Sequence, residues 1–392
     1  MKIFRRLSTP RLIVLLAAIT AAAVAASIGS VAALGSSAQS PAPKPLDQAL
    51  EEALTTPTPA GVTARVRFTN NLLPSAALSG ITGSGTSALM SGGSGRLWWS
   101  PDTGGRIELQ SDAGDVQILW DKARVRVWDS SSNTVYELPL PSAATAGSVP
   151  TDQAPTLADI DTFLKQLAGK ASVTDPSPAS LAGEPAYLVS VTPAQPAGLI
   201  GSLELAWDAT HGVPLEIALR AKGQSSPALA FKVTEISFGA VSASDLAVSP
   251  PANAKIVDLG GLSKPSPDAP GTQNVTGLAA VRAAIPFTLV APDTLGGLPR
   301  QSVQLLGGAD EGALVLYGEG LGGLALVEHA AGSSSGSSQA SNLPKVALGA
   351  VAGHELATQL GTVVLFERAG VSFMLGGSMP SHTVEAAARE LG

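Results

Sequence analysis

The chain has 392 residues, more than one hydrophobic core usually spans, and its 45% apolar content is too high for a disordered protein. The net charge of −7, with no cluster of Lys and Arg after Arg11, argues against a nucleic-acid partner. The absence of cysteine excludes disulfides, thiolate metal sites, a thiol nucleophile and lipid attachment through an N-terminal cysteine. We therefore expect two folded units and no nucleic acid.

The N-terminus carries an export signal. Lys2, Arg5, Arg6 and Arg11 precede an uncharged, apolar run that begins at Leu12. Basic residues before such a run place the chain that follows on the outer side of the membrane. We predict that residues 1–34 are a signal peptide or an N-terminal membrane anchor, and the residues leave both open. A Pro/Ser linker over 35–45 follows, so the body is expected to be extracytoplasmic.

The first domain is predicted over residues 46–257. Apolar residues from Leu46 to Leu54 recur at helical spacing, and Pro57 and Pro59 follow them. Segments in which apolar and polar residues alternate come next and predict half-buried strands joined by short turns. A second helix is predicted from the capping box at Thr156 to Gly169, and alternating strands then resume from Tyr187 to Phe238.

The apolar face of these strands must be shielded from water, and only two predicted amphipathic helices are available to pack against it. The predicted fold class is therefore α+β, with a curved antiparallel half-barrel sheet and helices in its concavity. Helices that fill the concavity incompletely would leave an apolar cavity suited to hydrocarbon, whereas a fully packed core is the alternative. The candidate cavity residues are Val66, Phe68, Trp99, Ile107, Leu109, Ile118, Trp120, Val125, Val127, Leu205 and Ile217.

A second unit is predicted after a linker over residues 258–284. Residues 285–392 are expected to form a smaller α+β domain with a hairpin joining 315–317 to 324–326 and a last helix for which Ser381 is the N-cap. The glycine-rich segment 318–323 matches a dinucleotide-binding pattern, but a strand rather than a helix is predicted after it. We interpret it as a turn, because phosphate binding needs a helix N-terminus there.

No catalytic or metal-binding constellation is found in the sequence. The histidines, at positions 211, 329, 354 and 382, are scattered singly and are expected on the surface or in turns. We predict a protein that is not an enzyme and holds neither a cofactor nor a metal.

An ordered set of short segments resembles the LolA superfamily over about residues 46–257. The segments are 95–101 (GRLWWSP), 118–121 (ILWD), 125–129 (VRVWD), 183–187 (GEPAY), 203–208 (LELAWD) and 212–215 (GVPL). The superfamily includes lipoprotein carriers, mycobacterial lipid-binding lipoproteins of the LppX and LprG type, and the MucB/RseB proteins.

The resemblance implies a LolA-like half-barrel and a non-catalytic carrier or chaperone in the cell envelope. Its expected partner is a lipid or an acylated protein, bound in the apolar cavity. The alternative is an envelope sensor of the MucB/RseB kind, whose partner is an anti-sigma factor or another membrane protein. Contact with the membrane itself is expected through the N-terminal segment if that segment is not cleaved.

Overall fold

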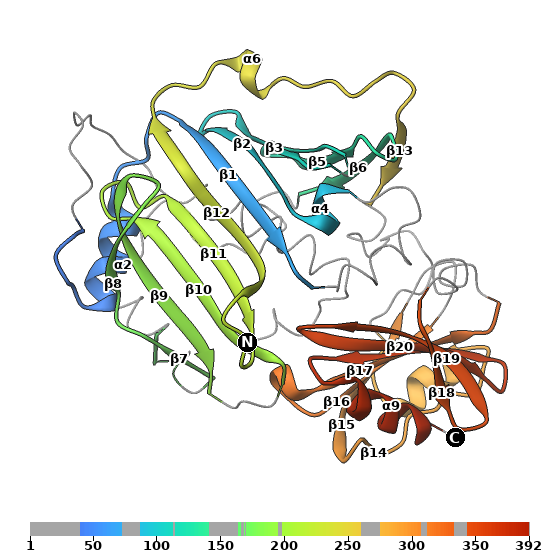
Figure 1. Ribbon diagram of the computed structural model, residues 1–392. Helices are drawn as coiled ribbons and strands as arrows, with labels where there is room; N and C mark the ends of the chain where they lie inside the picture. Colours follow the sequence, from blue (N-terminus) through green and yellow to red (C-terminus); the bar gives the residue numbers. More distant parts are fainter. Residues whose placement is uncertain are drawn as a thin grey trace.

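The computed structural model describes residues 40–72, 87–112, 114–140, 164–165, 168, 170–194, 198–259, 275–306, 312–332 and 343–391. These residues form two separate sheets (Figure 1). The predicted signal or anchor segment lies outside the described residues. None of the helices in the described ranges is both long and apolar enough to cross a membrane.

The larger sheet has thirteen strands, and most of its neighbours in space are also neighbours in sequence. Its order is β13-β6-β5-β4-β3-β2-β1-β12-β11-β10-β9-β7, with β8 paired to β9. The strands are β1 (Val62–Asn70), β2 (Gly93–Ser100), β3 (Gly104–Gln110), β4 (Val116–Trp120), β5 (Arg124–Asp129), β6 (Thr134–Pro139), β7 (Ala171–Val173), β8 (Ser177–Leu181), β9 (Glu184–Pro193), β10 (Ile200–Asp208), β11 (Pro214–Ala221), β12 (Pro227–Phe238) and β13 (Lys255–Asp258).

Alternation along these strands gives the sheet one apolar face and one polar face, because successive side chains point to opposite sides. Cross-strand pairs keep apolar residues together: Ala64 lies opposite Leu97, and Leu97 lies opposite Ile107. We call the face that carries these residues the inner face, and the other the outer face. The sheet curls strongly, so that β2 to β6 turn away from β9 to β12 (Figure 1).

Two helices pack on the inner face. The predicted first helix is α2 (Leu46–Thr55), whose buried Ala49 packs with Tyr187 and Trp207. The short α4 (Ala88–Ser91) packs beside β1 and β3, and the Ser87 hydroxyl caps it by accepting a hydrogen bond from Leu89 N–H. Most of the predicted second helix, 156–169, lies outside the described residues. Leu164, Lys165 and Ala168 of that segment are described and are helical.

The last strand of the larger sheet departs from the expected antiparallel pattern. β13 pairs with β6 in parallel, at the opposite edge from β7. The chain leaves β12, passes through α6 (Ala243–Leu246) and runs along the sheet to reach β6 (Figure 1). Arg106 secures this connection by donating a hydrogen bond to the Asp245 carbonyl at 3.1 Å. A connection of this length does not impose the reversal that a hairpin imposes, so a parallel pair is possible. With this exception the predicted fold class is confirmed.

The smaller sheet is antiparallel and has eight strands in the order β14-β15-β16-β17-β21-β20-β19-β18. Its strands are β14 (Thr294–Leu295), β15 (Leu298–Leu306), β16 (Gly312–Tyr317), β17 (Leu324–Ala330), β18 (Lys345–Leu348), β19 (Val351–Thr358), β20 (Gly361–Arg368) and β21 (Val371–Gly377). The predicted hairpin is the β16–β17 pair. The glycine-rich segment between them is a turn with one 3-10 stretch, Gly320–Gly322, as predicted.

Two helices pack against this second sheet. Helix α7 (Leu278–Ala284) falls in the predicted linker and contributes the buried Val281 to the core, next to β15. Helix α9 (Ser381–Arg389) buries Val384, Ala387 and Ala388. The prediction that Ser381 is its N-cap is wrong, because Pro380 holds that position and no side chain caps the helix. Ser381 is instead the first residue within the helix.

Candidate functional site

All the candidate cavity residues lie on the inner face of the larger sheet. Val66 and Phe68 of β1 are two residues apart and therefore point to the same side. Residues directly opposite each other on neighbouring strands also point to the same side, so the register places the other candidates on this face. The opposed pairs are Trp99 with Val62, Leu109 with Gly95, Ile107 with Ile118, Ile118 with Val127, Trp120 with Val125, Phe68 with Phe231, and Ile217 with both Phe231 and Leu205. The structure thus brings together residues spread from position 66 to 217.

Burial divides these residues into two groups. Val66, Trp99, Ile107, Leu109 and Val125 are buried, and Leu109 is only 1% exposed. All but Val125 belong to one core cluster that also contains Ala88 of α4 and residues near the turns at one end of β9 and β11, such as Ala186 and Val213. Around β1 to β3 the protein's own side chains therefore fill the inner face.

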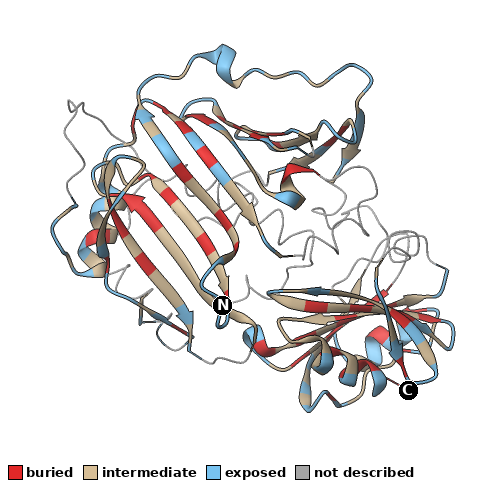
Figure 2. Cartoon of the chain, viewed as in Figure 1, coloured by how far each residue is buried: buried red, intermediate tan, exposed pale blue. Residues whose placement is uncertain are grey.

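The second group keeps part of its surface exposed. Phe68, Ile118, Trp120, Val127, Leu205 and Ile217 are half-buried. Leu203, Leu219 and Phe231 share the face with Leu205 and Ile217 and are also half-buried. We call Leu203, Leu205, Ile217, Leu219 and Phe231 the apolar strip; it crosses β10, β11 and β12, which are largely tan in Figure 2.

The apolar strip provides hydrophobic contacts to a ligand and contains no charged side chain. Its cross-strand neighbours on the same face are Val189 and Val191 of β9 on one side and Phe68 of β1 on the other. Such a surface favours hydrocarbon and provides no counter-ion for a charged group. Leu205 and Ile217 are among the candidate cavity residues, whereas Leu203, Leu219 and Phe231 are not, although all three lie at the same alternating positions of predicted strands.

The tryptophans divide between the two faces. Trp99 and Trp120 lie on the inner face, as their pairing with Val62 and Val125 shows. Trp98 and Trp128 point to the outer face, where the guanidinium of Arg106 lies 4.7 Å from the Trp98 ring centre. Only Trp99 and Trp120 of these four are therefore placed to report on a ligand at the inner face.

One buried polar cluster lies at the β10–β11 turn. Asp208 is fully buried, and its Oδ1 accepts a hydrogen bond from Thr210 N–H at 3.0 Å and lies 2.8 Å from His211 Nδ1. The His211 ring stacks on Phe238 with 3.8 Å between ring centres. Burial, and then the neighbouring Asp208, raise the pKa of Glu184. These contacts hold the turn in place, which is a structural role.

Metal binding finds no support in the described residues, where no group of three or more His, Asp or Glu side chains is arranged to hold an ion. His211 lies in a turn, as expected for the histidines, and His382 is exposed at the start of α9. His329 and His354 differ from expectation, because they are half-buried positions within β17 and β19. Each of these histidines lies on the side of its strand that faces away from the core, while the neighbouring residues Glu328 and Gly353 are buried.

Two of the hollows among the described residues are partly polar. One, of about 450 Å³, lies at the ends of β1 to β3 and includes Arg67, Phe68 and Gln110. The other, of about 240 Å³, lies over the middle of β1 and includes Arg65 and Arg96. Phe68 is the only candidate cavity residue among the residues lining these two hollows, so the predicted apolar cavity stays a prediction.

Comparisons with known proteins give matches only among solved structures. No family model matches the chain, and no curated protein matches it. The complex of MucA and MucB from Pseudomonas aeruginosa is 17% identical, with a TM-score of 0.42 over 87% of this chain and 95% of that one. A MucB structure in complex with MucA(peri) is also 17% identical, with a TM-score of 0.39 over 84% and 91%. A putative outer membrane lipoprotein-sorting domain from Vibrio parahaemolyticus is 9% identical, with a TM-score of 0.19 over 48% and 89%.

Proposed function

We propose that the inner face of the larger sheet binds the hydrocarbon part of a lipid or of an acylated protein, and that the chain is a non-catalytic, extracytoplasmic carrier or chaperone of the cell envelope. The observation that carries this proposal is the apolar strip. Five uncharged, half-buried side chains lie side by side on three neighbouring strands. Large aliphatic and aromatic side chains are often fully buried in a folded domain, whereas these five keep part of their surface accessible on one face of the sheet.

The energetics favour an acyl chain as the ligand. Moving one methylene from water to an apolar surface contributes about 0.8 kcal/mol, so a chain of several methylenes binds without a charged contact. The strip and its neighbours Val189 and Phe68 supply contacts of this kind only. The polar head of the ligand would then stay in water, beyond the sheet.

A substitution in the strip tests the proposal. We expect Ile217→Gln to weaken binding of the fluorescent fatty acid cis-parinaric acid by about 10-fold, because the amide replaces apolar contact by a group that must be desolvated. The matched control is Ile256→Gln, since Ile256 is 67% exposed and lies on β13, away from the strip. Titration of the full-length protein, followed by parinaric acid fluorescence, measures both affinities.

Two outcomes would count against the proposal. Binding that is absent, or that falls equally in Ile217→Gln and Ile256→Gln, would remove the strip as the site. Purified protein without any lipid detectable by mass spectrometry, combined with crosslinking to a membrane protein in intact cells, would favour the sensor alternative.

A further inference from the structure

The outer face of the larger sheet brings four cations together on β1, β2 and β12. Arg65 lies directly opposite Arg96, and Arg67 lies directly opposite Lys232. Like charges at directly opposed positions destabilise a sheet. The chain as a whole has a net charge of −7, so this cluster does not reflect a general excess of basic residues.

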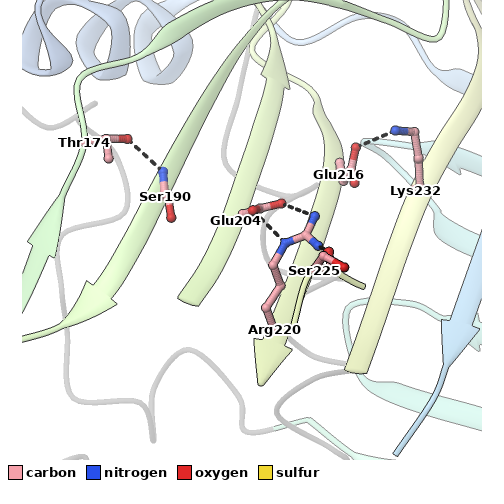
Figure 3. A network of polar contacts seen from close by, with 7 residues as sticks. All are labelled: Thr174, Ser190, Glu204, Glu216, Arg220, Ser225 and Lys232. Carbon is pink, nitrogen blue, oxygen red and sulfur yellow. Dashed lines mark hydrogen bonds and ion pairs between the residues drawn. The ribbon is translucent and has the colours of Figure 1, made fainter. Parts of the chain in front are cut away.

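Ion pairs neutralise only two of these four cations. Lys232 pairs with Glu216 at 2.8 Å, and Arg65 pairs with Glu235 at 2.9 Å. Figure 3 shows the Lys232 pair beside a second one on the same face, in which Glu204 holds Arg220 through two hydrogen bonds. By contrast, within the described ranges neither Arg67 nor Arg96 has an ion-pair partner, and both are exposed.

The carboxylate closest in register to Arg96 is already engaged. Glu108 of β3 lies opposite Arg96, but its Oε2 accepts a hydrogen bond from Arg106 at 2.7 Å and its Oε1 accepts one from Gln110 at 2.8 Å. The guanidinium of Arg96 is therefore left to solvent or to a ligand.

Both unpaired arginines line hollows on this part of the molecule. Arg96 lines the hollow of about 240 Å³ together with Arg65 and the hydroxyl-bearing Thr63 and Ser237. Arg67 lines the hollow of about 450 Å³. Ser94 and Gln110, which follow Arg67 across β2 and β3 in direct register, line the same hollow and add polar groups beside the charge.

We propose that the outer face of β1 and β2 binds an extended acidic segment of a partner protein through Arg67 and Arg96. Because Arg96 is opposite Arg65, it is the diagonal neighbour of Arg67, and such positions are about 7–8 Å apart. Alternate residues of an extended peptide are about 7 Å apart, so carboxylates at every second residue match this spacing. The flanking Glu108, Glu216 and Glu235 neutralise the neighbouring cations, so the unpaired positive charge is confined to Arg67 and Arg96. Charge confined to two neighbouring strands suits a narrow extended peptide better than a broad anionic surface such as a bilayer.

This site is on the opposite face from the apolar strip and does not depend on lipid binding. The probe is a short fluorescein-labelled peptide in which Glu alternates with Thr. We expect it to bind the full-length protein at low salt and to bind about 10-fold more weakly to the double variant Arg67→Gln/Arg96→Gln, since two charge-assisted contacts are lost. Affinity for cis-parinaric acid should not change in that variant.

The matched control is Lys122→Gln/Lys255→Gln, which removes the same charge from exposed positions outside β1 and β2. It should weaken peptide binding by less than about 2-fold, because distant exposed charges are screened. Equal losses in the two double variants, or no peptide binding, would overturn the proposal. So would binding to phosphatidylglycerol vesicles that requires Arg67 and Arg96 while the peptide does not bind. Circular dichroism should show both variants folded, because Arg67 and Arg96 each lie opposite a like charge and Lys122 and Lys255 are exposed.

Discussion

Glu328→Gln is expected to remove most of a fall in stability that the smaller domain of the native protein undergoes as pH rises from about 4.5 to about 7. Glu328 is fully buried in the core face of β17; Val290 N–H donates to its Oε2 at 2.8 Å, and its Oε1 has no partner. Burial raises the pKa of this carboxyl from 4.5 to about 7, and the Val290 hydrogen bond only partly opposes the shift.

The raised pKa fixes the sign of the effect. The folded domain holds the proton more tightly than the unfolded chain, so its stability is highest below pH 4.5 and is lost as pH rises through 7. The total loss is about 3 kcal/mol. Glutamine keeps an acceptor for Val290 but cannot ionise, so the variant should lose most of this pH dependence. A smaller part should remain from Glu355 of β19, because burial raises the pKa of that carboxyl as well.

Urea unfolding at pH 5 and pH 8, followed by circular dichroism, measures this difference. All five tryptophans precede residue 208, so tryptophan fluorescence follows the larger domain separately in the same sample. Glu319→Gln is the control, because Glu319 is exposed in the turn between β16 and β17. A native smaller domain that is equally stable at both pH values would contradict the buried, protonated state of Glu328.

Gly105→Ala is expected to destabilise the larger sheet by about 2 kcal/mol and to displace Trp120 from the inner face. Gly105 is directly opposite Trp120, and a Cβ at position 105 would lie 2.1 Å from Trp120 Cζ2 and 2.6 Å from its Cε2. The indole ring therefore occupies the space that any side chain at this position needs, and it must rotate or the two strands must separate.

Urea unfolding and the tryptophan emission maximum of the folded state measure the two effects. Gly239→Ala is the control, because Gly239 is an exposed position where a Cβ would meet nothing within 4 Å. A variant with native stability and an unchanged emission maximum would show that Trp120 does not rest over Gly105.

The strands of the larger sheet could be predicted because most of them combine alternation with short turns. Segments such as Val62–Asn70 and Gly104–Gln110 have one more polar and one more apolar face, and burial alternates along much of each strand. Their alternation also predicted which side chains share a face, and the register confirms this for every candidate cavity residue. Helix α2 was predictable for the same reason, since its apolar residues recur at helical spacing.

Features that depend on distant residues escaped the sequence analysis. β13 is a short strand of four residues, with Ile256 exposed, so its own residues carry no signal that it pairs with β6. The cation cluster on the outer face could not be predicted either. Arg65 and Arg67 were recognisable as the polar side of a strand, but only the register places Arg96 and Lys232 beside them. Likewise, burial of Glu328 depends on the packing of the segment that contains Val290.

The route of the chain from β12 to β13 affects the order in which the larger domain can fold. β6 ends at Pro139, yet the strand that covers its free side begins only at Lys255. Until synthesis has passed that point, β6 presents unpaired backbone groups to any other extended chain. Contacts between residues so far apart in sequence also form slowly, on a scale of about milliseconds to seconds. A chaperone acting on the nascent chain would therefore be most useful between the appearance of β6 and that of β13.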